Sequence, residues 1–484
     1  MKNLKQSEKI IAGVCWSVLL LLLNFGIARH QFILLLSVYA LAFLLCAFIM
    51  QRVQGQDVSF FVLISVLVRA CVVFSTPKLS DDIYRFLFDG NLFTHGINPF
   101  LYTPREVLAT QNLGDIFPIL FSRINSPDYF SVYPPVLQFL FATVARIFPQ
   151  SVTAQVFLFK FFIFLFDCGV LTISYQLSVI SYRQINKKQS FYSEFLKVFK
   201  SSKSLRDIST LNLKLPTFNH QPPTQILWYA LNPLVVTELC GNAHAEGIMI
   251  FFLLAAIYFF NRNEKYFFLS ALCMSLSIAT KLLPLMLLPF LMRYLSLKIF
   301  IKYIAVVFGL SAIYFLPFYS TVLVTHFRNS LGLYFSKFEF NASLFYVLRA
   351  WDFWWKGYDN IAQITPQLTV ATILFITYLL RRQFKNAISK TWSSDFWEYS
   401  LAALCFYFLC ATTVHPWYAV VPLAFAGFTR FRFPMLWTFT IVFTYSGYAQ
   451  GSSRHTENYW WIAAEYLSVV CFAFWELRTS KYKV

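Results

Sequence analysis

The chain has 484 residues, of which 58% are hydrophobic and 13% charged, and its formal net charge is +18. This balance excludes an ordinary soluble globular protein, in which about 45–50% of residues are apolar and about 25% are charged. The Lys and Arg residues stand in short clusters between apolar segments rather than on one basic surface. They therefore predict membrane lipid, and not nucleic acid, as a partner.

Long apolar runs follow one another along the chain, and a membrane-spanning helix needs about 20 such residues. The runs lack the alternation of a barrel strand, and only helices or closed barrels satisfy backbone groups in hydrocarbon. The sequence therefore predicts an all-α polytopic protein of about 13–14 spanning helices with a single integral membrane domain, 1–484. The candidate spans are 10–28, 32–50, 59–76, 154–180, 223–240, 247–260, 266–281, 282–296, 299–317, 361–380, 397–413, 416–429, 433–449 and 459–476.

The basic residues predict how the chain is oriented, because cytoplasmic loops carry the excess of Lys and Arg. The first apolar run follows three lysines as a signal peptide would, but it is too long and has no convincing cleavage site, so we interpret it as a retained first helix. With a cytoplasmic N-terminus, the basic insertion 181–222 is expected in the cytoplasm. The apolar stretch 133–149 must then be re-entrant or lie along the outer interface; if it spans the membrane instead, the insertion lies outside.

Two long loops, 77–132 and 318–360, are expected on the extracytoplasmic side, and the first carries six carboxylates against four basic residues. Loop 318–360 contains Asn341 in an Asn-Ala-Ser sequence, which is a glycosylation sequon only in a eukaryotic host. Because the acidic balance of loop 77–132 is the reverse of the cytoplasmic pattern, we expect this loop to carry chemistry rather than to set orientation.

Loop 77–132 begins with a charged helical pattern, because Asp81, Arg85 and Asp89 recur at i and i+4 and share one helix face. We interpret it as a juxtamembrane helix that presents carboxylates at the bilayer surface and is ended by the turn at 96–100. Its apolar residues are expected to lie against the membrane: Ile83, Phe86, Leu87 and Phe88. The alternative is that Asp81 and Arg85 form an ordinary exposed ion pair, but adjacent Asp81 and Asp82 are costly to crowd together, and one of them suits a general base.

A second polar group interrupts the apolar runs between 232 and 247. Asn232-Pro233 and Glu238 precede Gly241-Asn242-Ala243-His244-Ala245-Glu246, and polar groups at membrane depth usually face a water-filled cavity. A short solvated turn between two helices is the alternative for His244. Asp167 lies deeper in another apolar run, where structural and functional roles are both open.

Two further residues mark expected outer turns. Lys281 suits a phosphate at headgroup level, with snorkelling at a helix end as the alternative. His415 precedes Pro-Trp-Tyr, so it fits a headgroup belt or the wall of a site.

These motifs, in this order, resemble the GT-C superfamily of polytopic glycosyltransferases, and most closely glycosyltransferase family 87 and related bacterial mannosyltransferase-like proteins. The resemblance spans about residues 60–430 and departs from the family at the basic insertion and at Glu246, where Asp is expected. It rests on Ser80-Asp81-Asp82-Ile83-Tyr84-Arg85, Asp89-Gly90, Gly96-Ile97-Asn98-Pro99-Phe100, Tyr133-Pro134-Pro135, Asn232-Pro233, Gly241-Asn242-Ala243-His244, Lys281-Leu282-Leu283-Pro284 and His415-Pro416-Trp417-Tyr418.

The resemblance implies transfer of a hexose, mannose by family preference, from a polyprenyl-phosphate donor to a glycolipid, polysaccharide or protein acceptor outside a bacterial inner membrane. Asp81 or Asp82 is then the catalytic base. Donor and substrate binding is expected from Arg85, Asp89, Asn98, His244, Glu246, Lys281 and His415.

Cofactor needs follow from the leaving group. A lipid phosphate leaves as a stable anion that needs only positive neighbours, which Lys281, Arg85 and His415 can supply, so no metal is obligatory. A pyrophosphate carrier or a metal held by Asp81 and Asp82 would overturn this expectation.

The competing function is a transporter or flippase of a lipid-linked or anionic substrate, which also needs many helices and buried polar groups. Such proteins often show internal repeats, and none is evident here. A structural or signalling membrane protein is a more distant alternative.

Overall fold

The computed structural model describes residues 4–200, 222–262, 264–326, 338–358, 360–385, 394–449 and 455–481, with single positions between 327 and 337. This part of the chain is helical, and its only β-type pairing is one bridge between Phe340 and Thr413, which confirms the predicted all-α class. The N-terminal half contains α1 (Gln6–Gly26), α2 (Phe32–Arg52), η1 (Gly55–Asp57), α3 (Val58–Val72), α4 (Asp82–Thr94), α5 (Pro104–Thr110), α6 (Ile116–Phe121), α7 (Pro135–Ile147), α8 (Val152–Lys200), η3 (Pro222–Gln225), α9 (Ile226–Ala230), α10 (Pro233–Val235), η4 (Val236–Gly241) and α11 (Glu246–Phe260). The C-terminal half contains η5 (Glu264–Tyr266), α12 (Phe267–Thr280), η6 (Leu283–Leu287), α13 (Leu288–Leu291), α14 (Leu297–Phe315), η7 (Leu316–Phe318), α16 (Leu344–Lys356), α17 (Ile361–Lys385), α18 (Ser394–Cys410), η8 (Pro416–Ala419), α19 (Val420–Ala426), α20 (Phe433–Thr440), η9 (Ile441–Tyr448) and α21 (Tyr459–Lys481).

Six of the described helices are long and apolar enough to cross a membrane, which makes the protein multi-pass. A seventh candidate is broken: Pro233–Gly241 and Glu246–Phe260 meet at a bend of 110°. Several of the other apolar windows fold as shorter helices, because Pro, Gly and polar residues end them within 10–17 residues. The six are Gln6–Gly26, Phe32–Arg52, Val152–Ile180, Leu297–Phe318, Ile361–Lys385 and Tyr459–Thr479.

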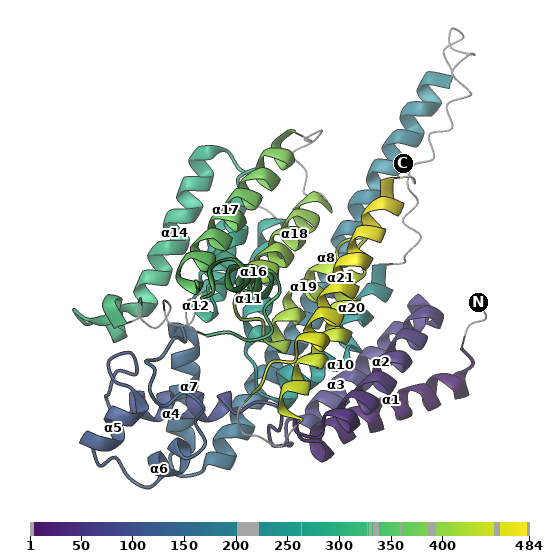
Figure 1. Ribbon diagram of the computed structural model, residues 1–484. Helices are drawn as coiled ribbons and strands as arrows, with labels where there is room; N and C mark the ends of the chain where they lie inside the picture. Colours follow the sequence, from purple (N-terminus) through teal and green to yellow (C-terminus); the bar gives the residue numbers. More distant parts are fainter. Residues whose placement is uncertain are drawn as a thin grey trace.

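Helices α4 to α7 form a lobe at one end of the protein, while the C-terminal part of α8 extends from the opposite end (Figure 1). Of the basic insertion 181–222, residues 181–200 continue α8 and 201–221 lie outside the described residues. Helix α7 has 13 residues, about 20 Å at 1.5 Å per residue, which is shorter than a hydrocarbon core of about 30 Å. This length favours the re-entrant or interfacial interpretation of 133–149 over a full span.

The apolar face of α4 lies inside the protein, so the prediction that it rests on the membrane was wrong. Phe86 is 4% exposed and stacks on Phe141 of α7 at 4.9 Å between ring centroids. At Gly90, an added Cβ would lie 2.4 Å from the backbone oxygen of Phe141, so the two helices approach at van der Waals distance. An amphipathic pattern shows that one face of a helix avoids water, but it does not show whether lipid or other protein segments cover that face.

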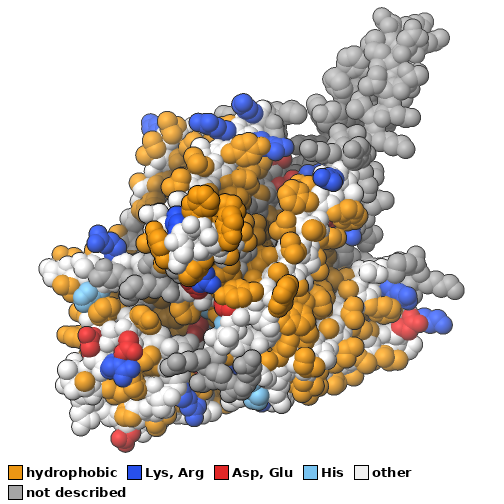
Figure 2. Space-filling model, viewed as in Figure 1, with side chains coloured by type: hydrophobic (Ala, Val, Ile, Leu, Met, Phe, Trp, Pro, Cys, Tyr) orange, Lys and Arg blue, Asp and Glu red, His pale blue; other side chains and the backbone are white. Residues whose placement is uncertain are grey.

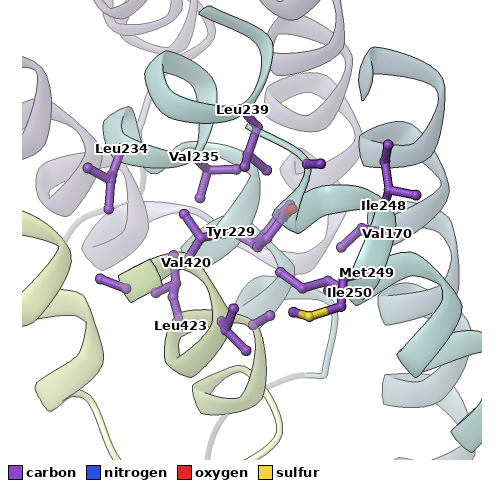
Figure 3. Close-up of a cluster of buried hydrophobic side chains, with 14 of the residues drawn as sticks. Val170, Tyr229, Leu234, Val235, Leu239, Ile248, Met249, Ile250, Val420 and Leu423 are labelled. Atoms are coloured by element: carbon purple, nitrogen blue, oxygen red, sulfur yellow. The ribbon is translucent and has the colours of Figure 1, made fainter. Parts of the chain in front are cut away.

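The centre of the bundle is an apolar cluster contributed by α8, α9, α10, η4, α11 and α19 (Figure 3). A fully buried ion pair lies beside it: Arg69 Nε donates to Asp167 Oδ2 at 2.6 Å. Tyr229 donates to the other oxygen of Asp167 at 2.5 Å, and Arg69 also donates to the carbonyl oxygen of Ala230 at 2.8 Å. Asp167 thus has a structural role in tying α8 to α3 and α9.

The Asn341 sequon is buried rather than presented at the surface. Asn341 is 0% exposed, and its amide donates to Glu465 of α21 at 3.2 Å. A sugar chain has no access to this side chain in the folded protein.

Candidate functional site

Four segments that are distant in sequence converge at the inner edge of the α4–α7 lobe: the start of α4, the turn 238–246, η8 and η9. On the face seen in Figure 2, acidic, basic and histidine side chains lie close together along the boundary between the lobe and the helices above it. We call these four segments, together with the side chains that contact them, the outer site.

The turn 238–246 exists because the helix around it cannot continue. Asn232 caps α10, η4 is a π-helix, and Ala243 adopts a left-handed φ of +66°. Such irregular backbone at membrane depth is tolerated only inside protein or beside a cavity. The side chain of Asn242 then accepts hydrogen bonds from the backbone N–H groups of Lys78 and Leu79, at 3.1 and 2.9 Å. This contact fixes the start of loop 77–132 against the turn.

Asp82 and His244 face each other across this junction. His244 Nε2 lies 4.0 Å from Asp82 Oδ2, and no hydrogen-bonding partner reaches this nitrogen within the described chain although the side chain is 2% exposed. Asn125 donates to the other oxygen of Asp82, Oδ1, at 2.9 Å. An oxygen atom about 2.8 Å from both Asp82 Oδ2 and His244 Nε2 fits this separation, since 2.8 Å is an ordinary hydrogen-bond length.

Glu238 lies behind His244 and is also buried, at 1% exposure. His244 Nδ1 is 3.0 Å from the carbonyl oxygen of Glu238 and 3.2 Å from its Oε2. Tyr445 of η9 donates to Oε1 at 2.6 Å. The side chain of Glu238 therefore points at the imidazole from the side opposite Asp82.

The wall of the site is aromatic. His244 stacks on Trp417 with 3.4 Å between ring centroids, and His415 stacks on the same indole at 4.4 Å. Burial, and then the nearby His244, Lys281 and His455, hold the pKa of His415 well below its usual value. The lowered pKa disfavours the charged imidazole, so the position of His415 fits the wall of the site, one of the roles that the sequence suggested for it.

Lys281 and Glu246 form an ion pair at the far end of this wall. Glu246 is buried, whereas the Lys281 side chain is 26% exposed and its Nζ lies 5.5 Å from the centre of the Tyr418 ring. Glu246 Oε2 has no hydrogen-bonding partner in the described part of the chain. Lys281 is thus a partly accessible cation held at the site rather than a snorkelling side chain alone.

Asp81 has a different environment from Asp82 although the two are adjacent. Arg29 Nη2 pairs with Asp81 Oδ2 at 2.6 Å, and the same guanidinium lies 4.7 Å from the centre of the Tyr448 ring. The Asp81 side chain is 39% exposed. Its charge is therefore already matched by Arg29, whereas Asp82 contacts His244 and Asn125 and pairs with no Lys or Arg in the described part of the chain.

Three predicted site residues make their hydrogen bonds within the lobe or with the segment that follows α14. Arg85 donates to Asp89 at 2.8 Å and to the carbonyl oxygens of Ser126 and Tyr129, so this buried pair holds 126–129 against α4. Asn98 donates to the carbonyl oxygen of Phe318 at 2.7 Å and joins loop 77–132 to the start of loop 318–360. Of the nine predicted residues, the structure brings Asp81, Asp82, His244, Glu246, Lys281 and His415 together.

Sequence reasoning left four contributors out of the predicted site: Arg29, Asn125, Glu238 and Tyr445. Glu238 carried a usable signal, a carboxylate within an apolar segment. The other three gave none, because an Arg after a first helix, an Asn in a loop and a Tyr near a helix end are common in any membrane protein. In the described residues, no three His, Cys, Asp or Glu side chains are arranged to hold a metal ion.

Comparison with known proteins confirms the predicted likeness to membrane mannosyltransferases. Residues 213–296 match the family model described as the N-terminal domain of Alpha-(1->6)-mannopyranosyltransferase, a stretch that contains the turn 238–246 and Lys281. The chain is 22% identical over 190 residues to Alpha-(1->6)-mannopyranosyltransferase B of Corynebacterium glutamicum, which covers 39% of this chain and 24% of that protein. The chain thus spans about a quarter of the length of that relative, and no solved structure matches it.

Proposed function

We propose that the protein is a membrane glycosyltransferase that transfers a hexose, mannose by similarity to its relative, from a polyprenyl-phosphate donor to a glycan acceptor. The observation that carries this proposal is the opposition of Asp82 Oδ2 and His244 Nε2 across 4.0 Å. Within the described chain, His244 Nε2 has no hydrogen-bonding partner, and Asn125 contacts only the other oxygen of Asp82. An acceptor hydroxyl bound here donates its single proton to Asp82 Oδ2.

Asp82 is the base in this mechanism. As the acceptor oxygen forms its bond to the anomeric carbon of the donor, the hydroxyl proton passes to Asp82 Oδ2. The bond from the anomeric carbon to the phosphate oxygen breaks, and the phosphate keeps the electron pair. Attack opposite the leaving group inverts the anomeric centre, and one positioned carboxylate is sufficient for proton removal.

The donor phosphate needs positive neighbours more than it needs an acid, because it leaves as a stable anion. Lys281 is the partly exposed cation of the wall, and Arg29 lies at the other edge beside Asp81. Both already have a carboxylate partner, so the phosphate binds by sharing these cations. Arg85 is buried against Asp89, so it is a less accessible cation than Lys281.

The orientation that fits this chemistry has the outer site on the extracytoplasmic side and the N-terminus in the cytoplasm of a bacterial inner membrane. The opposite placement of the α4–α7 lobe and the C-terminal part of α8 (Figure 1) supports it, since α8 leads into the basic insertion. The acceptor is a glycolipid, a polysaccharide or a protein on that side.

One feature favours the alternative of a transporter or flippase. A helix broken by 110° at membrane depth, with polar groups at the break, is a frequent substrate site in transporters. The first experiment therefore has to distinguish transfer of the sugar to an acceptor from transport of the lipid-linked donor across the membrane.

Transfer of radiolabelled mannose from polyprenyl-phosphate mannose, measured in membranes that contain equal amounts of wild type, Asp82→Asn and Asp81→Asn, tests the proposal. Loss of one general base predicts a fall of about 100-fold or more for Asp82→Asn. Unchanged transfer in Asp82→Asn would remove this carboxylate from the chemistry. Labelled donor that crosses reconstituted vesicles containing wild type without any transfer would establish the transporter instead.

A further inference from the structure

Two buried groups at the outer site have no assigned task in the transfer mechanism. Glu238 is an unneutralised carboxylate at 1% exposure, and His244 has an unpartnered Nε2 at 2% exposure. Buried polar atoms are almost always hydrogen-bonded, so an orphan that faces a candidate base needs an explanation.

We infer that Glu238 and His244 form the proton-accepting half of the site, in which His244 Nε2 takes the proton that Asp82 removes from the acceptor and Glu238 stabilises the resulting imidazolium. This inference rests on the proposed function and adds two residues with separate roles to it. His244 touches the reacting hydroxyl and exchanges the proton, whereas Glu238 acts through His244 as a positioning residue.

The backbone settles which nitrogen is available. His244 Nδ1 lies 3.0 Å from the carbonyl oxygen of Glu238, which can only accept a hydrogen bond. The proton of the neutral ring therefore belongs on Nδ1, and the lone pair of Nε2 faces Asp82. A shift of about 1 Å closes the 4.0 Å gap to hydrogen-bonding distance.

The carboxylate of Glu238 favours the transfer of a proton from Asp82 to His244. Glu238 Oε2 is 3.2 Å from His244 Nδ1, and its other oxygen accepts from the neutral Tyr445 hydroxyl. No Lys or Arg contacts Glu238 within the described chain, so its charge is matched only when His244 carries a second proton. A buried carboxylate behind an imidazole stabilises the imidazolium in the same way as in a Ser-His-Asp triad.

Other titratable groups surround His244 and bear on its protonation. Asp82 faces it from α4, Glu238 from η4 and His415 from the wall, and Tyr445 contacts Glu238 from η9. Further out lie the pairs Asp81 with Arg29 and Glu246 with Lys281, and Tyr448 beside Arg29. The two ion pairs are internally balanced, so Asp82 and Glu238 are the carboxylates that face His244 directly.

The proton balance is simple. The acceptor hydroxyl gives its proton to Asp82, Asp82 gives it to His244 Nε2, and His244 releases it to water once the product has left. No other reactant is needed, and the carboxylate of Asp82 is regenerated before the next acceptor binds.

The test combines transfer kinetics with a readout that does not depend on transfer. Histidine labelled with ¹⁵N in its ring reports the tautomer and charge of each of the seven His residues, and His244→Asn assigns the His244 signal. The variants are Glu238→Gln and His244→Asn, and the control is Asp128→Asn, which removes an exposed carboxylate paired with Arg105 on the lobe.

We expect the ring ¹⁵N shifts to place a proton on Nδ1 of His244 in wild type, where the Glu238 carbonyl oxygen accepts it, and we expect these shifts to change in Glu238→Gln, because the adjacent carboxylate is lost. We also expect kcat to fall about tenfold or more in Glu238→Gln and further in His244→Asn, with KM for the acceptor little changed. The Asp128→Asn control should match wild type in both measurements.

Two results would overturn the inference: a proton on Nε2 rather than Nδ1 of His244 in wild type, or wild-type transfer together with wild-type His244 ¹⁵N shifts in Glu238→Gln. A wild type that transfers no mannose would instead count against the proposed function, and the ring ¹⁵N shifts would still test the pairing of His244 with Glu238. If Glu238→Gln fails to fold, Tyr445→Phe keeps the carboxylate and removes one of its hydrogen bonds, so it should change the ring ¹⁵N shifts of His244 and lower transfer, whereas Asp128→Asn should change neither.

Discussion

The protein contains two buried groups of charged residues that differ in how many of their polar atoms have hydrogen-bonding partners. The inner group is Arg69, Asp167 and Tyr229, and the outer group is Glu238, His244 and Tyr445. In the inner group, the two oxygens of Asp167 accept hydrogen bonds from Arg69 and Tyr229, and Arg69 also donates to backbone carbonyl oxygens. In the outer group, Glu238 and His244 leave Oε2 and Nε2 without a hydrogen bond in the described chain, and the nitrogen faces Asp82. A closed group stabilises the fold, whereas an open one keeps atoms available for a substrate.

The largest effect on stability is expected from opening the inner group. Asp167→Asn leaves the Arg69 guanidinium buried without its counter-charge, which costs about 3–5 kcal/mol. Thermal unfolding of the detergent-solubilised protein measures this, and Asp82→Asn at the partly exposed loop should shift it by less than about 0.5 kcal/mol. An Asp167→Asn protein that stays stable and loses transfer would place Asp167 in the mechanism.

A matched pair of variants sharpens the comparison. Tyr229→Phe and Tyr445→Phe each delete one phenol that donates to a buried carboxylate, at 2.5 and 2.6 Å. Each should cost about 1.5–3 kcal/mol of stability, as for hydrogen bonds to charged groups. Only Tyr445→Phe should also lower mannose transfer per folded molecule, by about fivefold for about 1 kcal/mol in the transition state. Equal transfer in both would show that the outer group is structural like the inner one.

A smaller effect on transfer is expected from replacing Asp81, whose ion pair is exposed to solvent. Asp81 is 39% exposed and paired with Arg29, and such pairs contribute about 1 kcal/mol or less. Asp81→Asn should therefore reduce transfer by no more than about fivefold, against the far larger loss in Asp82→Asn. The same radiolabel assay measures both, and a reversed order would assign the base to Asp81.

The smallest effect concerns pH and His415. Its pKa in the folded protein lies well below the unfolded value, so the unfolded chain binds the proton more readily. Stability from this residue is present above the unfolded pKa of about 6.5 and is lost as pH falls toward the folded pKa, at no more than about 1.4 kcal/mol per pH unit. His415→Gln should flatten the decline in thermal stability between pH 7 and pH 5. An unchanged slope would show that other groups cause the decline.

The sequence predicted part of the site because these charged and polar residues interrupt or directly follow apolar segments, where such residues are rare. Asp81 and Asp82 follow an apolar segment, and His244, Glu246 and Lys281 interrupt others. It also proposed Arg85, Asp89 and Asn98, which have the same local character but hold the lobe together. Sequence spacing locates polar residues along the chain, but it does not reveal which of them find partners elsewhere.

The sequence by itself determined the all-α membrane class, since a chain with this hydrophobic fraction satisfies its backbone in lipid only through helices. Tertiary structure decided that the apolar face of α4 packs on α7, that Asp81 is paired while Asp82 is available, and that Glu238 stands behind His244. The reason is physical: hydrophobicity is a local property of a segment, whereas the partner of a buried charge is fixed by packing between segments far apart in the chain.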